Sequence, residues 1–196
     1  MSSLSPTDRR LAERAVEALE AIAAHLRGVD PQGPSQPSLP HDLGAVPEDY
    51  YELLARIESN NRPYVKAQTS SASGLYQFTR ATWLDLGGDW GSRTDVAFGG
   101  LKPSEAEQLE RVRSLTEASA AQLKRAGLAV NRASLYACHF LGAGTAVTVI
   151  AADTDVLMSD LVSKAAARAN PTILGHGKTV ASFLSWLHKK TGDWAR

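Results

Sequence analysis

Residues 50–83 contain the pattern that most restricts how this chain can fold. Large apolar side chains recur there at helical spacing: Tyr50, Leu53, Leu54 and Ile57. This spacing predicts an amphipathic helix with one buried side. The next residues, Asn60-Asn61-Arg62-Pro63, end the helix, because proline has no backbone donor and its predecessor favours extended geometry. The fold must therefore accommodate a helix that stops abruptly near residue 60.

Glu58 lies directly after Ile57, close to this helix end and at the edge of the apolar side. A carboxyl group partly removed from water keeps its proton to higher pH, as a general acid working near neutrality requires. The alternative is a solvated glutamate in the last turn of a surface helix. Glu58 is therefore a candidate catalytic acid, to be judged together with the residues that follow it.

The segment after the helix has turn composition. Thr69-Ser70-Ser71-Ala72-Ser73-Gly74 predicts a tight loop or hairpin beside the helix end, and Leu75 to Phe78 give a short alternation. Thr79 is a suitable cap for a helix that carries Ala81, Trp83 and Leu84.

Four segments in this order resemble the signature of the lytic transglycosylases of the lysozyme-like superfamily. They are Glu58-Ser59, Ser70-Ser71-Ala72-Ser73, Gly74-Leu75-Tyr76-Gln77 and Thr82-Trp83. The stretch from Tyr136 to Gly144 is similar to the family's second motif, with His139 and Phe140 where many relatives have Tyr and Asn. The resemblance covers about residues 48–188 and extends to the branch with phage-type or cytoplasmically made members. It implies a mainly α, lysozyme-like domain (goose-type lysozyme or SLT-like) with at most a small β-hairpin.

The resemblance also implies a chemistry. Glu58 is then the single general acid and base that cleaves the β-1,4 bond between N-acetylmuramic acid and N-acetylglucosamine, with a 1,6-anhydro product and no cofactor. The implied substrate-binding residues are Gln77, Tyr76, Ser70, Ser71, Ser73, His139 and Tyr136. The serines also fit a purely loop-shaping role, and His139 fits a satisfied core position. Two rival functions stay open: a hydrolytic muramidase using Asp85, Asp89 or Asp95, and a non-catalytic glycan-binding component of a virion or secretion apparatus.

The remainder of the chain reads as helices and one linker. Helices are expected from Ser104 to about residue 126, over 132–141, 145–151 and 155–169, and at the end of the chain. Cys138 lies in an apolar run and is expected to be buried. Residues 1–28 predict a separate amphipathic helix and residues 29–47 a Pro- and Gly-rich linker, before a domain over 48–196. The first helix suits docking on this domain, docking on another protein, or a solvated appendage.

Charge and composition exclude several classes of function. Lys plus Arg and Asp plus Glu number 21 each, so no net field attracts nucleic acid or an anionic membrane. The five histidines have no metal-ligand spacing, and no stretch predicts a membrane span or a signal peptide. We expect peptidoglycan as the partner of a chain made in the cytoplasm. It would act in the periplasm or cell wall after delivery by a virion, a secretion apparatus or lysis.

Overall fold

The computed structural model describes residues 42–196. The predicted helix over 1–28 and residues 29–41 of the predicted linker lie outside the described residues. The compact unit begins at Asp42, because the carbonyl of Leu43 accepts a hydrogen bond from the Val130 amide at 2.6 Å and Val46 packs against the core. Residues 42–47, which the sequence places in the linker, therefore belong to this unit.

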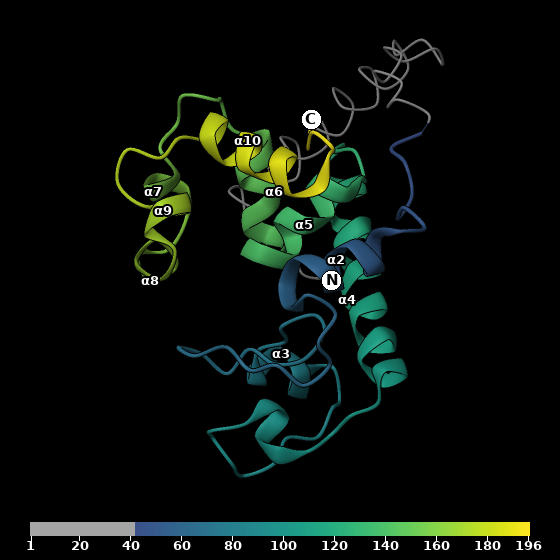
Figure 1. Ribbon diagram of the computed structural model, residues 1–196. Helices are drawn as coiled ribbons and strands as arrows, with labels where there is room; N and C mark the ends of the chain where they lie inside the picture. The colour runs from purple at the N-terminus through teal and green to yellow at the C-terminus, as the bar shows by residue number, and fades with distance from the viewer. Residues whose placement is uncertain (1–41) are drawn as a thin grey trace, which may run out of the picture. The chain divides into compact units, whose positions relative to one another are not determined.

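The described part of the chain is mainly helical, as predicted, and has no sheet (Figure 1). Its elements are α2 (Tyr50–Ser59), α3 (Arg80–Asp85), the 3-10 helix η1 (Ala97–Gly100), α4 (Glu105–Arg125), α5 (Arg132–Leu141), α6 (Ala143–Ala151), α7 (Met158–Leu161), α8 (Lys164–Ala169), α9 (Pro171–Leu174) and α10 (Val180–Thr191). The predicted hairpin is reduced to isolated antiparallel bridges that pair Ser73 with Lys66 and with Phe78. No helix within residues 42–196 is both long and apolar enough to cross a membrane.

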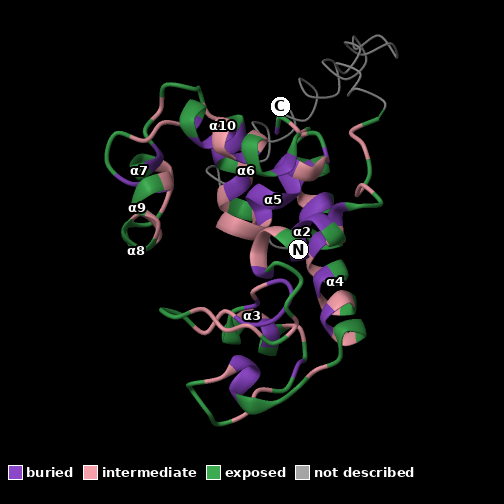
Figure 2. Ribbon diagram, in the orientation of Figure 1, coloured by how far each residue is buried: buried purple, intermediate pink, exposed green. Residues whose placement is uncertain are grey.

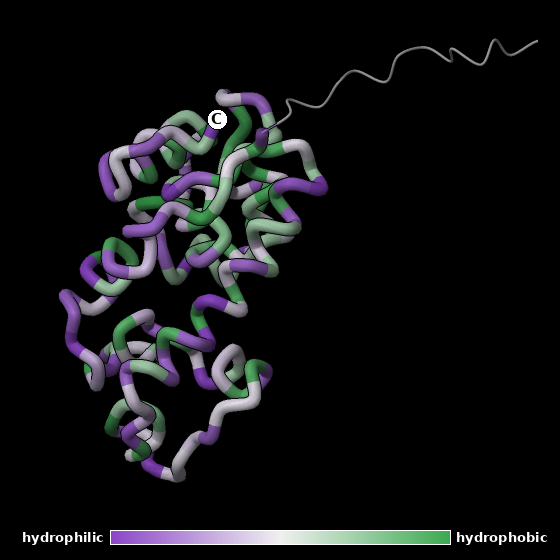
Figure 3. The backbone as a smooth tube through the Cα atoms, turned by 90° about the vertical axis from the view of Figure 1, so that its right-hand side faces the viewer, coloured by the Kyte–Doolittle hydropathy of each residue, from purple (hydrophilic) through white to green (hydrophobic). Residues whose placement is uncertain are grey.

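Helix α5 lies at the centre of the core. It contacts α4, α6 and α10, and every residue from Ala133 to Cys138 is buried (Figures 1 and 2). Asn131 caps its start and Gly142 follows its end, both as predicted. The predicted caps at Thr79 and Ser104 are also confirmed. Within single helices, hydrophilic and hydrophobic residues alternate along the backbone (Figure 3). This is expected for amphipathic helices that pack around a core.

The predicted single helix over 155–169 is wrong. The chain there forms α7 and α8, separated by extended backbone at Val162. Residues 156–158 instead pair with residues 178–180, since the Met158 amide donates to Lys178 and the Val180 amide donates to Val156. Ser163 then caps α8 as a new helix start.

The loop between α3 and α4 folds around aromatic rings. The Phe78, Trp83 and Phe98 rings pack in series, with centroids 5.1 Å and 4.7 Å apart, and the Trp83 indole donates to the Asp89 carbonyl. Trp90 also packs on Phe98, with ring centroids 5.5 Å apart. This packing gives a defined shape to a segment that has little secondary structure of its own.

Candidate active site

Glu58 is the penultimate residue of α2, and its side chain is half-buried. The helix ends immediately afterwards, because Asn60 and Asn61 adopt left-handed backbone geometry with φ of 53° and 59°. The Ser59 hydroxyl donates to the Ala55 carbonyl and accepts from the Arg62 amide, at 2.9 Å and 3.2 Å. The backbone around Glu58 is therefore fixed on both sides.

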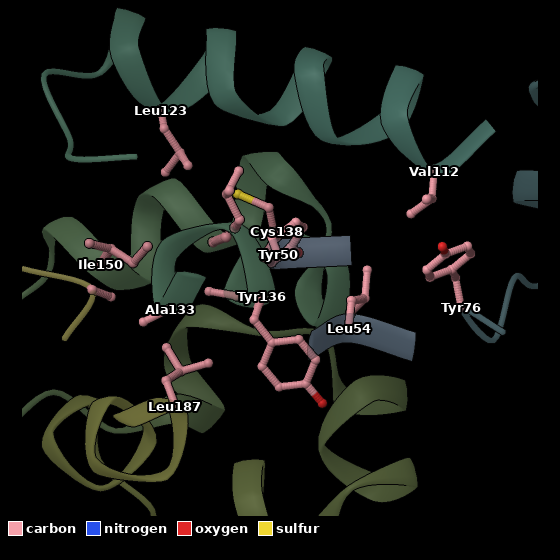
Figure 4. Close-up of a cluster of buried hydrophobic side chains, with 14 of the residues drawn as sticks. Tyr50, Leu54, Tyr76, Val112, Leu123, Ala133, Tyr136, Cys138, Ile150 and Leu187 are labelled. Carbon is pink, nitrogen blue, oxygen red and sulfur yellow. The ribbon is translucent and has the colours of Figure 1, made fainter. Parts of the chain in front are cut away.

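Tyr136 of α5 faces this carboxyl group. Burial raises the pKa of the Tyr136 hydroxyl well above its usual range, and the charge of Glu58 and a hydrogen bond with it act in the same direction. The nearby Glu58 charge also contributes to raising the pKa of buried Tyr50, after the larger effect of burial. Figure 4 shows Tyr50 and Tyr136 in the same part of the core. Both phenols stay protonated at neutral pH, so the Tyr136 hydroxyl is available to donate to the carboxylate.

His139 lies one turn beyond Tyr136, with the two rings stacked at 6.5 Å and an interplanar angle of 14°. Burial lowers the pKa of His139, against the opposing effects of the Glu58 charge and the Tyr76 carbonyl. The imidazole is therefore neutral at pH 7, with one donor and one acceptor nitrogen. His139 therefore fits both predicted roles, that of a core residue because it is part-buried and that of a substrate-binding residue because it lies beside a carboxyl group.

Gln77 shares a pocket of about 290 Å³ with His139. Its backbone is left-handed, with φ of 49°, and its side-chain amide donates to the Gly74 carbonyl at 3.0 Å and to Val65 at 3.4 Å. These bonds hold the amide group and leave its oxygen to accept from a ligand. Gln122 and Thr82 add further polar groups to the pocket wall.

Tyr76 is part of the core, with 4% of its surface exposed. Burial raises the pKa of its hydroxyl, and the opposing charge of Arg113 shows that the hydroxyl lies near α4. Figure 4 shows the ring beside Val112 of that helix. The Tyr76 side chain therefore lies in the core and not on an open surface available to a sugar ring.

The three predicted serines shape the loop. Ser73 is fully buried, donating to the Ser71 carbonyl at 2.9 Å and accepting from the Phe98 amide at 3.2 Å. Ser71 accepts from the Arg80 amide and Ser70 from the Ala72 amide. Ser70 and Ser71 line a second pocket, separate from the one that Gln77 and His139 share. The structure thus groups Glu58 with Tyr136 and His139, with Gln77 adjacent, and places the serines elsewhere.

The site contains residues that the sequence reasoning missed. Trp186 of α10 stacks on Tyr136 with centroids 5.6 Å apart and contacts Phe140 at 4.9 Å. Its side chain is half-buried. The signal was present in the sequence as aromatic residues at helical spacing, Tyr136 with Phe140 and Phe183 with Trp186, but of these only Tyr136 was predicted to bind substrate.

Glu58 is the only carboxyl group in the described residues that acts on the pKa values of Tyr50, Tyr136 and His139. Asp95 is instead paired with Arg93 at 2.7 Å. No cluster of three or more possible metal ligands occurs within residues 42–196. The arrangement thus offers one carboxyl group supported by a phenol and a neutral imidazole.

Among protein-family models and curated proteins, none matches this chain.

Proposed function

We propose that this chain is a peptidoglycan lytic transglycosylase with a lysozyme-like fold of the goose-type or SLT-like kind. The supporting observation is the half-buried Glu58, which faces the Tyr136 hydroxyl and lies near the neutral His139. The order of motifs from Glu58 to Trp83 and the mainly helical architecture support the same proposal.

In the first step, protonated Glu58 donates its proton to the oxygen that bridges N-acetylmuramic acid and N-acetylglucosamine. The bond from C1 to that oxygen breaks, and negative charge develops on the carboxyl group. The Tyr136 hydroxyl stabilises this charge, because a hydrogen bond to an ionised group contributes about 1.5–3 kcal/mol. The substrate's acetamido group stabilises the cation at C1, with His139 or Gln77 as its hydrogen-bond partner.

In the second step, the Glu58 carboxylate takes the proton of the muramic C6 hydroxyl. The C6 oxygen forms a new bond to C1, which yields the 1,6-anhydro sugar and restores protonated Glu58. Every proton is accounted for within the two sugars and this one side chain. Water is neither consumed nor required.

Hydrolysis on the same fold is the main rival. Two-carboxylate glycosidases place their acids roughly 5–9.5 Å apart. In the described residues Asp95 is neutralised by Arg93, and no aspartate acts on the neighbours of Glu58. These observations favour a single-carboxylate lyase over a hydrolase. The non-catalytic glycan-binding role keeps the same pocket and is distinguished only by turnover.

Purified sacculi provide the test. Wild-type protein should release muropeptides with anhydro ends, which mass spectrometry separates from reducing ends by the mass of one water. Glu58→Gln should abolish release and keep the wild-type circular dichroism spectrum and melting temperature. Release of reducing ends would assign a hydrolase, and no release by folded wild-type protein would assign the non-catalytic role. Equal activity of Glu58→Gln would reject Glu58 as the acid.

A further inference from the structure

A second pocket lies between the serine loop, the start of α3 and the loop that precedes η1. Its volume is about 340 Å³. Three cationic side chains line it: Lys66, Arg80 and Arg93. None of its lining residues belongs to the cluster around Glu58, so it is a separate feature of the surface.

The positive charge of this pocket is only partly neutralised. Arg93 pairs with Asp95 at 2.7 Å, and both side chains are more than half exposed, at 62% and 66%. Lys66 donates to two backbone carbonyls, those of Ala67 and Ser70, both at 3.0 Å, and has no carboxylate partner among residues 42–196. The Arg80 guanidinium likewise forms no ion pair within those residues. Two positive charges therefore remain for an incoming anion.

Trp90 gives the same pocket an apolar wall. The half-buried indole is held against Phe98, with ring centroids 5.5 Å apart, and it also lines the pocket. Hydroxyl-bearing side chains also line the pocket, those of Thr69, Ser70, Ser71 and Thr94. A fixed aromatic ring next to hydroxyl groups suits the apolar face and the hydroxyls of a sugar ring.

We propose that this pocket binds a saccharide that carries a carboxylate, with Arg80 and Lys66 holding the anion and Trp90 contacting the sugar ring. The inference rests on the proposed function, because the peptidoglycan strand supplies such groups. The carboxylate comes either from the lactyl substituent of a muramic residue without peptide or from the attached peptide stem. Arg80 is the better anion ligand, since its guanidinium presents two parallel donors to a carboxylate.

The test measures binding, so it does not depend on cleavage. Soluble fragments of three kinds are titrated in the Glu58→Gln background: neutral N-acetylglucosamine oligomers, peptide-free glycan with free lactyl groups, and glycan with intact stems. We expect a carboxylate-bearing fragment to bind more tightly than the neutral oligomer. Arg80→Gln should weaken that binding about fivefold to tenfold, and 0.5 M NaCl should remove most of the difference. Arg125→Gln, an exposed change in the last turn of α4, is the matched control and should leave the Kd unchanged.

The outcomes separate the two proposals. Equal binding of neutral and anionic fragments, or salt-independent binding, overturns the pocket assignment even where wild-type protein cleaves sacculi. Salt-dependent, Arg80-dependent binding supports it even where Glu58→Gln proves fully active. A preference for stem-bearing over peptide-free glycan identifies the stem as the source of the carboxylate, and the reverse identifies the lactyl group. Because the salt series uses unchanged Arg80, the pocket remains testable should Arg80→Gln not fold.

Discussion

Gln108 is the buried residue whose replacement tests the local architecture most directly. Its side chain is fully buried on α4. The oxygen accepts from the Leu75 amide at 2.8 Å, and the nitrogen donates to the Pro63 and Pro103 carbonyls at 3.1 Å and 3.2 Å. One amide thus joins three loop segments, one of which leads directly into Gln77.

Replacing it by leucine keeps the approximate volume and removes all three hydrogen bonds. Each typical bond contributes about 0.5–1.5 kcal/mol net, and an unsatisfied buried donor costs about 1–3 kcal/mol. Gln108→Leu should therefore lower the free energy of unfolding by about 3 kcal/mol. For a domain of this length, that loss corresponds to a melting temperature about 6–12 °C lower.

Thermal unfolding followed by circular dichroism measures this shift. Gln122→Leu on the same helix is the matched control, because Gln122 is only half-buried and its side chain forms no hydrogen bond within the described residues. Hydrogen exchange of the Leu75 amide should also become faster in Gln108→Leu but not in the control. A melting temperature of Gln108→Leu within about 2 °C of wild type, or an equal decrease in both variants, would refute the conclusion that the Gln108 hydrogen bonds stabilise the three loop segments.

Three further outcomes follow from the site. Tyr136→Phe keeps the stacked ring but removes the hydroxyl that faces Glu58, so kcat on sacculi should fall about tenfold to a hundredfold while the melting temperature changes little; unchanged kcat would exclude a charge-stabilising role. Burial raises the pKa of the Cys138 thiol to about 12, so iodoacetamide should label it only in denaturant, and rapid labelling of native protein would contradict its burial. Burial lowers the pKa of His139, so the unfolded chain binds a proton more readily and stability should decline as pH falls below about 6.5. Melting temperatures from pH 8 to pH 5 should show a weaker decline in His139→Gln, and parallel curves would remove His139 as the cause.

Features set by neighbouring residues could be predicted from the sequence. The end of α2 follows from Asn60 to Pro63, and α5 has the predicted limits because Asn131 and Gly142 act over a few residues. The position of Glu58 at the first of these ends was therefore predictable, as was the burial of Cys138.

Features that depend on contacts with distant parts of the chain could not be predicted from the sequence. Gln108 looks like a solvated helix residue until three remote backbone groups are placed around it. Helix α4 accordingly buries Gln108, Val112 and Thr116, whereas the more apolar Leu109 and Leu115 are only half-buried. The division of residues 155–169 likewise depends on pairing with a segment about twenty residues later.

The two left-handed asparagines after Glu58 limit how far the carboxyl group can travel. At a frayed helix end, the last side chains move together with the backbone. The left-handed turn at Asn60 and Asn61 ends α2 in a defined conformation, so Glu58 moves mainly by rotation about its own side-chain bonds. A partner molecule must then be brought to the carboxyl group, so selectivity depends on how the surrounding surfaces orient what enters.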